Sequence, residues 1–307
     1  MNLLPSELIR SNFSDLNDPA ILLDGPKFRV LHRTVFEYAG PVTDSVNTLH
    51  LEPRTFPFQR TISAIVKVLP STRMRRFSDL FDNVTHHFEL SVEHQRLEIE
   101  SRLKIQNLPL DVPQSSRIAT LAEYHGDDIP ERTWVYLQES RFVSRHPEIW
   151  RQAIDITRGA GPAVFPQALA IMQWVHREFR YEAGSTHVNT HLEEAFALRR
   201  GVCQDFTHVM LGLCRAVGIP GRYASGYLYN GPRDHLVGAQ ASHAWPEIFF
   251  PEVGWIGFDP TNNTLADERY IKIAVGRDYD DVAPVRGSYK GSGTCKMTVT
   301  VEVEKAD

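Results

Sequence analysis

The spacing of hydrophobic residues changes near residue 110, and this change constrains the fold more than any other feature of the sequence. Between Phe28 and Ile105 the apolar residues recur at every second position, which is the period of a β-strand with one buried face. Turn signals such as the segment FDNV at 81–84 separate the runs. We therefore expect residues 25–110 to form an N-terminal antiparallel β domain that resembles a sandwich.

Beyond the proline-containing segment 106–116 the hydrophobic period becomes helical. Helical spacing is found twice, over Leu169, Met172, Val175 and Phe179 and again over Phe206, Met210, Leu213 and Val217. Strand patterns follow at 222–229, 244–250, 255–259 and 297–303. The chain is therefore expected to be α+β, with residues 111–307 as a second domain of helices followed by strands. Residues 1–24 lack periodicity and are expected to form an extended arm.

The composition excludes several classes of protein. The 307 residues are 42% hydrophobic and carry a net charge of −5, and the basic residues are scattered along the chain. No nucleic-acid or membrane partner is therefore expected. The amino terminus has no basic segment followed by an apolar run, and no later run approaches the roughly 20 apolar residues that span a bilayer. With three cysteines in no framework spacing, a cytoplasmic protein is expected.

Cys203 is placed where the second helical pattern begins. The unpaired N–H groups of a helix amino terminus stabilise a thiolate, which is the reactive form of cysteine. Asp205 opposes this effect if it faces the sulfur, but the interpretation we favour is that it caps the first turn. Cys214 returns to nearly the same side of the helix three turns later and is expected to be buried and inert. Cys203 is therefore the candidate nucleophile.

His243 and Asp259 are placed on one predicted hairpin, and they are the candidate base and its orienting group. If Phe249 lies opposite Trp255, Asp259 becomes the diagonal neighbour of His243 on the same face of the hairpin. Diagonal neighbours have Cβ atoms about 7–8 Å apart, which allows a hydrogen bond between imidazole and carboxylate. A shift of one residue in the register would turn Asp259 to the opposite face. A cysteine, a histidine and an orienting acid together are typical of nucleophilic catalysis.

Several segments carry a family resemblance. Four segments resemble the core of the transglutaminase-like superfamily, in the bacterial branch whose members carry a β-rich domain before the core. They are GVCQDF at 201–206, LGLCRAVGIPGRYASGYL at 211–228, SHAW at 242–245 and GWIGFDPTNN at 254–263. Two further segments, FRVLHRTVFEY at 28–38 and VNTLHLEPR at 46–54, resemble the β-rich leading domain of that branch. The resemblance implies a papain-like α+β core in which the helix that carries the nucleophile packs on an antiparallel sheet. It also implies a Cys–His–Asp triad, which corresponds here to Cys203, His243 and Asp259.

The remaining candidate residues concern the walls of the cleft. The backbone N–H of Cys203 is one natural oxyanion donor, and Gln204 and Tyr181 are candidates for the second. Trp245 lies two residues after His243 and therefore points to the same face of the predicted strand. It either borders the same groove or belongs to the core. No cofactor and no metal site are expected.

The expected reaction is thiol-dependent acyl transfer on a peptide or amide substrate. Hydrolysis by a cysteine peptidase or amidase is favoured, because many bacterial members of the superfamily that the chain resembles are regarded as cysteine proteases. Two alternatives stay open: a protein-glutamine transglutaminase that uses an amine acceptor, and an inactive binding or scaffold protein of the same fold. A weaker third alternative is a non-enzymatic partner of a peptide-ligating or cell-wall system.

Overall fold

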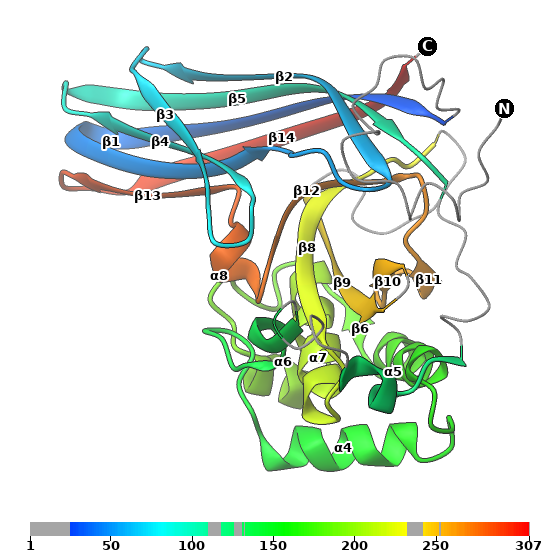
Figure 1. The fold of residues 1–307 in the computed structure, drawn as a ribbon. Helices are drawn as coiled ribbons and strands as arrows, with labels where there is room; N and C mark the ends of the chain where they lie inside the picture. Colours follow the sequence, from blue (N-terminus) through cyan, green and yellow to red (C-terminus); the bar gives the residue numbers. More distant parts are fainter. Residues whose placement is uncertain are drawn as a thin grey trace, which may run out of the picture.

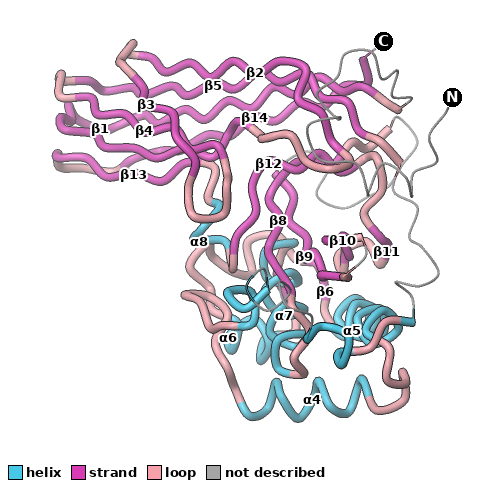
Figure 2. Tube along the Cα trace, in the orientation of Figure 1, coloured by secondary structure: helices cyan, strands magenta, loops and turns pink. Residues whose placement is uncertain are grey.

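The computed structural model describes residues 25–109, 118–125, 131, 133–231, 242–251 and 253–306. The expected arm at 1–24 and most of the expected boundary segment 106–116 lie outside these residues. Figure 1 and Figure 2 show three layers, with a large sheet at one end, helices at the other and a second sheet between them. The α+β class expected from the sequence is confirmed.

The first domain is a seven-stranded antiparallel sheet built around one long strand. Five strands follow the order β2-β5-β1-β4-β3, and β13 and β14 both pair with β1. Their bounds are β1 (Lys27–Glu52), β2 (Gln59–Leu69), β3 (Met74–Ser78), β4 (Val84–Leu90), β5 (His94–Asn107), β13 (Val285–Lys290) and β14 (Cys295–Ala306). Apolar side chains of β1, β2, β4 and β5 pack into one cluster that includes Leu49, Val68, Phe88 and Ile99.

Strand β1 changes its buried face along its length. Even-numbered residues from Phe28 to Thr34 are buried, whereas odd-numbered residues from Ser45 to Leu51 are buried in the second half. The change coincides with an irregularity in the pairing with β5 between Glu37 and Val42, and Asp44 adopts a φ of 48°. The first half pairs with β5 and β14 and the second half with β4 and β13, so that β1 passes from one group of strands into another.

The core domain packs helices on one face of a five-stranded antiparallel sheet with the order β11-β10-β9-β8-β12. The strands are β8 (Gly221–Leu228), β9 (Ser242–Phe250), β10 (Gly254–Asp259), β11 (Thr264–Leu265) and β12 (Tyr270–Gly276). The helices are α4 (Pro147–Thr157), α5 (Val164–Glu178), α6 (Leu192–Leu198), α7 (Cys203–Ala216) and α8 (Tyr279–Val282), with short 3-10 turns η2 (Leu121–His125) and η3 (Trp134–Leu137).

Helix α7 lies at the centre of this domain. It contacts α4, α5 and α6 on its outer side and β8 and β9 on its inner side. Every residue from Gln204 to Cys214 is buried, and the expected burial of Cys214 is confirmed. A two-stranded parallel sheet of β6 (Arg180–Tyr181) and β7 (Arg200–Gly201) leads the chain into α7.

The two domains meet along the outer edge of β12. Side-chain amides of the first domain hydrogen-bond to backbone groups on that edge: Gln59 to N and O of Lys272, and Asn83 to N and O of Val275. Asn107 Nδ2 donates to the carbonyl of Tyr270. These amides satisfy backbone groups that a sheet edge otherwise leaves unpaired.

The terminal strands correct one expectation. The alternation at 297–303 was expected to belong to the second domain, which was assigned residues 111–307. In the structure this segment is β14, which pairs with the first half of β1, and β13 pairs with the second half. The period of two identifies a strand but not its partner, so this placement was not visible in the sequence. Within the described part of the chain, no helix combines the length and apolar character needed to cross a bilayer.

Candidate active site

Cys203 is the first residue of α7, and the turn before it is held by Asp205. The Oδ2 of Asp205 accepts hydrogen bonds from the backbone N–H of Val202 at 2.8 Å and from the hydroxyl of Thr186 at 2.7 Å. The prediction that Asp205 caps the helix is therefore confirmed. A Cβ on Gly201 would collide with the Asp205 carboxylate, so that only glycine allows this close approach. The cap fixes the half-buried Cys203 at the positive end of the helix.

The hairpin of β9 and β10 adopts the register expected from the sequence. Trp255 pairs with Phe249 and Gly257 with Glu247. His243, near the start of β9, and Asp259, at the end of β10, consequently lie on the same face. Their side chains form a hydrogen bond of 2.8 Å between Nε2 and Oδ2, and both side chains are fully buried.

The Asp259 carboxylate is surrounded by donors. Oδ1 accepts from the backbone N–H groups of Thr261 and Asn262, while Oδ2 accepts from the side-chain amide of Asn262 and from the hydroxyl of Tyr270 at 2.7 Å. Burial opposes ionisation of this carboxyl, but the imidazole of His243 and these donors outweigh it and hold the Asp259 pKa below its usual value. Asp259 is therefore a fixed negative charge next to the imidazole.

The imidazole of His243 is influenced by both Asp259 and Cys203. Burial favours the neutral imidazole, yet the charge of Asp259 and, after it, the Cys203 thiol raise the pKa of His243 to about 10. Because Nε2 is occupied by Asp259, Nδ1 is the nitrogen left for the sulfur. Nδ1 is buried and forms no well-aligned hydrogen bond with any described residue. Loose alignment of this kind is common in catalytic pairs without substrate.

Two aromatic side chains enclose the His243–Asp259 pair. Trp245 is buried and stacks on the imidazole with the ring centroids 6.0 Å apart, and Tyr270 lies against Trp245 at 5.2 Å. Trp245 was a sequence candidate. Tyr270 was missed because the strand that carries it, β12, was not predicted. The alternation of Ile271 and Ile273 in that strand was the available signal.

The other candidates occupy different positions around Cys203. The side-chain amide of Gln204 donates to the carbonyl of Val188 at 3.0 Å and thereby holds the loop after β6. Burial and then the charge of Cys203 raise the pKa of the half-exposed Tyr181. The same two causes raise the pKa of Tyr223 well above its ordinary value; this fully buried tyrosine on β8 was not identified from the sequence. Among the described residues, no group of three or more potential ligands is arranged to hold a metal ion.

Comparisons with known proteins place this chain in a family. A profile of the transglutaminase-like superfamily matches residues 151–260, and a profile of the bacterial transglutaminase-like N-terminal region matches residues 28–106. An uncharacterised protein of Mycobacterium leprae is 35% identical over 282 residues, covering 91% of this chain and 99% of that protein. The chain belongs to the transglutaminase-like superfamily. Its N-terminal domain and core both correspond to family regions.

Two further proteins are similar to this chain. A candidate cysteine protease from Cytophaga hutchinsonii has a solved structure that matches with a TM-score of 0.73 and 23% identity, covering 92% of each chain. This match shows a shared fold. A protein-glutamine gamma-glutamyltransferase of Pseudomonas aeruginosa is 34% identical over 132 residues, which cover 38% of this chain and 19% of that protein.

Proposed function

We propose that this chain is a cysteine-dependent enzyme that transfers the acyl group of an amide or peptide bond to water. The observation that carries the proposal is the orientation of His243, which uses Nε2 for Asp259 and leaves Nδ1 for Cys203 at the start of α7. An imidazole that is held by a carboxylate on one side is suited to accept the proton of a thiol on the other.

The reaction has two steps. The sulfur of Cys203 attacks the carbonyl carbon of the amide, the C–N bond breaks, and the proton that left the thiol passes from His243 to the departing amine. Water then attacks the thioester, giving a proton to His243, and the C–S bond breaks to release a carboxylic acid and restore Cys203. Asp259 keeps the imidazole in one tautomer and orientation during both steps.

An amine acceptor is the second candidate. The similarity to a protein-glutamine gamma-glutamyltransferase extends over 132 residues. In this variant a primary amine replaces water in the second step and a new amide forms. The groups of the chain that handle the proton are the same in both cases.

The three cysteines provide an internal test. Iodoacetamide labelling followed by mass spectrometry should modify Cys203 faster than Cys295, although Cys295 is more exposed, and should leave the buried Cys214 unmodified in the folded protein. Hydrolysis of a peptide and amide library should fall by roughly 10⁵-fold in Cys203→Ala, with Cys295→Ala as the matched control. Adding a fluorescent primary amine separates hydrolysis from transamidation. Equal labelling of Cys203 and Cys295, with no turnover, would identify an inactive scaffold.

A further inference from the structure

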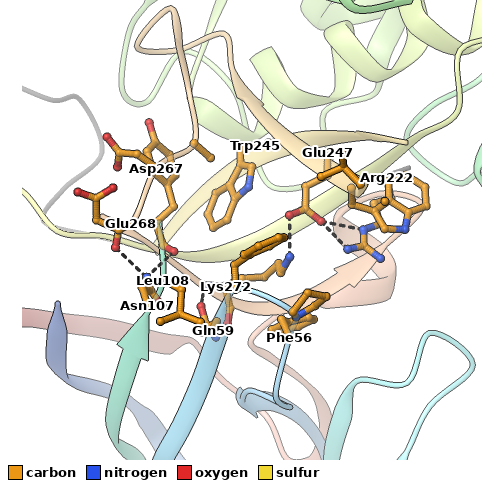
Figure 3. A pocket seen from close by; sticks show the side chains of 18 of the residues that line it. Phe56, Gln59, Asn107, Leu108, Arg222, Trp245, Glu247, Asp267, Glu268 and Lys272 are labelled. Carbon is orange, nitrogen blue, oxygen red and sulfur yellow. Dashed lines mark hydrogen bonds and ion pairs between the residues drawn. The ribbon is translucent and has the colours of Figure 1, made fainter. Parts of the chain in front are cut away.

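A cavity of about 700 Å³ lies between the first domain and the five-stranded sheet (Figure 3). The first domain contributes Phe56, Gln59 and Asn107 to one wall, and strands β8, β9, β10 and β12 form the opposite wall. Of the described residues that line it, none is Cys203, His243 or Asp259. The volume lies in the range of sites for small molecules.

One end of the cavity carries an excess of positive charge. Arg222 and Lys272 both pair with the single carboxylate of Glu247, at 2.7 Å in each case. Arg222 and Glu247 are buried, and burial, partly offset by Glu247, lowers the pKa of Lys272 to about 8, so that this amine is still protonated at neutral pH. Two cations against one anion in a nearly dry site leave one charge that a bound anion would neutralise.

Hydrogen-bond donors without acceptors lie in the same walls. The indole Nε1 of Trp245 is buried and has no acceptor among the described residues, and the buried Nε of Arg54 also lacks one. An unsatisfied buried donor costs on the order of 1–3 kcal/mol, a cost that an acceptor on a ligand would remove. Figure 3 shows Trp245 on the same wall of the cavity as Glu247 and Lys272.

The other end of the cavity has the opposite character. Asn107 uses its Nδ2 for the backbone carbonyls of Glu268 and Tyr270, and its Oδ1 is buried without a donor among the described residues. Asp267 forms an ion pair with Arg269, whereas the Glu268 carboxylate forms no ion pair with a described residue. Figure 3 places Asp267 and Glu268 together beside Asn107, away from Arg222. This end offers acceptors to a cationic donor.

We infer that this cavity binds a short peptide with free termini. Its carboxylate lies against Arg222, Lys272 and the indole N–H of Trp245. Its ammonium lies against Glu268 and Asn107 Oδ1. The aromatic ring of Phe56 and the body of Trp245 supply the apolar wall between the two ends.

The cavity is adjacent to the candidate active site through two shared side chains. Trp245 lines the cavity and stacks on His243, and Tyr270 lines it and donates to Asp259. A ligand in the cavity therefore contacts the groups that hold the imidazole without occupying the cleft at Cys203. The inference requires no turnover, so binding can be measured with Cys203→Ala, and its failure is distinct from failure of the proposed reaction.

Isothermal titration calorimetry of the full chain carrying Cys203→Ala tests the site with four probes: alanine, trialanine, trialanine amide and N-acetyl-trialanine. We expect one saturable site for trialanine and none for alanine, because the two charged groups of alanine lie on one carbon and cannot reach both ends of the cavity at once. Removing either terminal charge should weaken binding by about tenfold. Glu268→Gln should weaken the peptide with a free ammonium by a similar factor and leave its N-acetyl form unchanged.

The matched control is Glu93→Gln, at an exposed acid on the first domain, which should alter no affinity. Lys272→Met should act on trialanine but not on its amide; if it fails to fold, the partly exposed Glu268 still decides the question. The absence of saturable binding by trialanine would overturn the inference, as would alanine that binds as tightly as trialanine. Capped peptides that bind as tightly as the free peptide, or an equal effect of Glu268→Gln on both forms, would also overturn it.

Discussion

Two buried histidines in different regions of the molecule have opposite acid–base properties. His32, at the domain interface, hydrogen-bonds the hydroxyls of Tyr227 and Thr34, and burial lowers its pKa to about 4. His243, in the candidate active site, is buried to a similar degree, but the Asp259 carboxylate raises its pKa to about 10. The charge of the partner, rather than the depth of burial, decides whether a buried imidazole is neutral or cationic.

The surroundings of the two histidines also differ in charge. The interface is joined by neutral groups, namely amides on the edge of β12 and an apolar cluster of Phe28, Val30, Tyr227 and Ile271. The candidate site instead concentrates charge on His243 and Asp259. A buried charged pair costs more desolvation than neutral amides and apolar side chains do, and the same cost applies to Glu247 and its two cations at the cavity.

The largest expected effect is a loss of kcat on substitution around His243 that substitution of His32 does not cause. Asp259→Asn should retain the fold and lower kcat for the proposed hydrolysis by about 10⁴-fold, because an amide no longer fixes the imidazole tautomer. His32→Gln removes an equally buried imidazole and should change kcat by less than about threefold. Steady-state kinetics and circular dichroism measure both. The comparison fails if the two substitutions reduce kcat to a similar extent.

The next effect is on stability as a function of pH. The folded pKa of His32 is about 4 against an unfolded value near 6.5, so the unfolded chain binds more protons between these values. Stability should therefore rise from pH 4 to 6.5, by on the order of 3 kcal/mol from this group. The folded pKa of His243 is about 10, so its contribution is complete below pH 6.5 and is lost as the pH rises towards 10.

Urea unfolding at several pH values checks both signs. His32→Asn should flatten the acidic limb and leave the alkaline limb unchanged, whereas His243→Asn should flatten the alkaline limb, each relative to the unsubstituted chain. An alkaline limb that is flattened by His32→Asn, or left unchanged by His243→Asn, would contradict the assignment of charge to the two imidazoles.

The smallest expected effect concerns the interface amides. Asn83→Ala removes two hydrogen bonds to Val275 and leaves buried backbone groups on β12 unsatisfied, which should lower the free energy of unfolding by about 1–3 kcal/mol. Gln95→Ala, at an exposed amide of the same domain, should change it by less than about 0.5 kcal/mol. Denaturant unfolding compares them, and equal losses would mean that the amides do not satisfy the strand edge.

The local geometry of the site could be predicted from the sequence, because it depends on the alternation of side chains along each strand and on the length of the hairpin turn. With Phe249 opposite Trp255, the pairing of His243 with Asp259 follows from the period of two along each strand. The start of α7 was visible in the spacing of its apolar residues. These features are set by residues that are close together in the sequence.

Features that depend on distant segments could not be predicted. Tyr270 reaches Asp259 because β12 pairs with β8 across an intervening hairpin, and no spacing in the sequence specifies that pairing. The same limit applies to β14, whose alternation identifies a strand but not its position beside β1. The amide of Gln204 was a candidate for the oxyanion, and only the fold brings the carbonyl of Val188 to it.

The placement of β14 beside β1 has a consequence for how the chain is made on the ribosome. Strand β1 leaves the ribosome before the core and can pair with β5, but the other edge of its first half stays unpaired until Cys295–Ala306 has been synthesised. The whole core is translated in that interval and can fold first, as domains do during synthesis. An open strand edge recruits other chains. Slow translation through the core should therefore prolong the period in which the nascent chain is prone to misassembly.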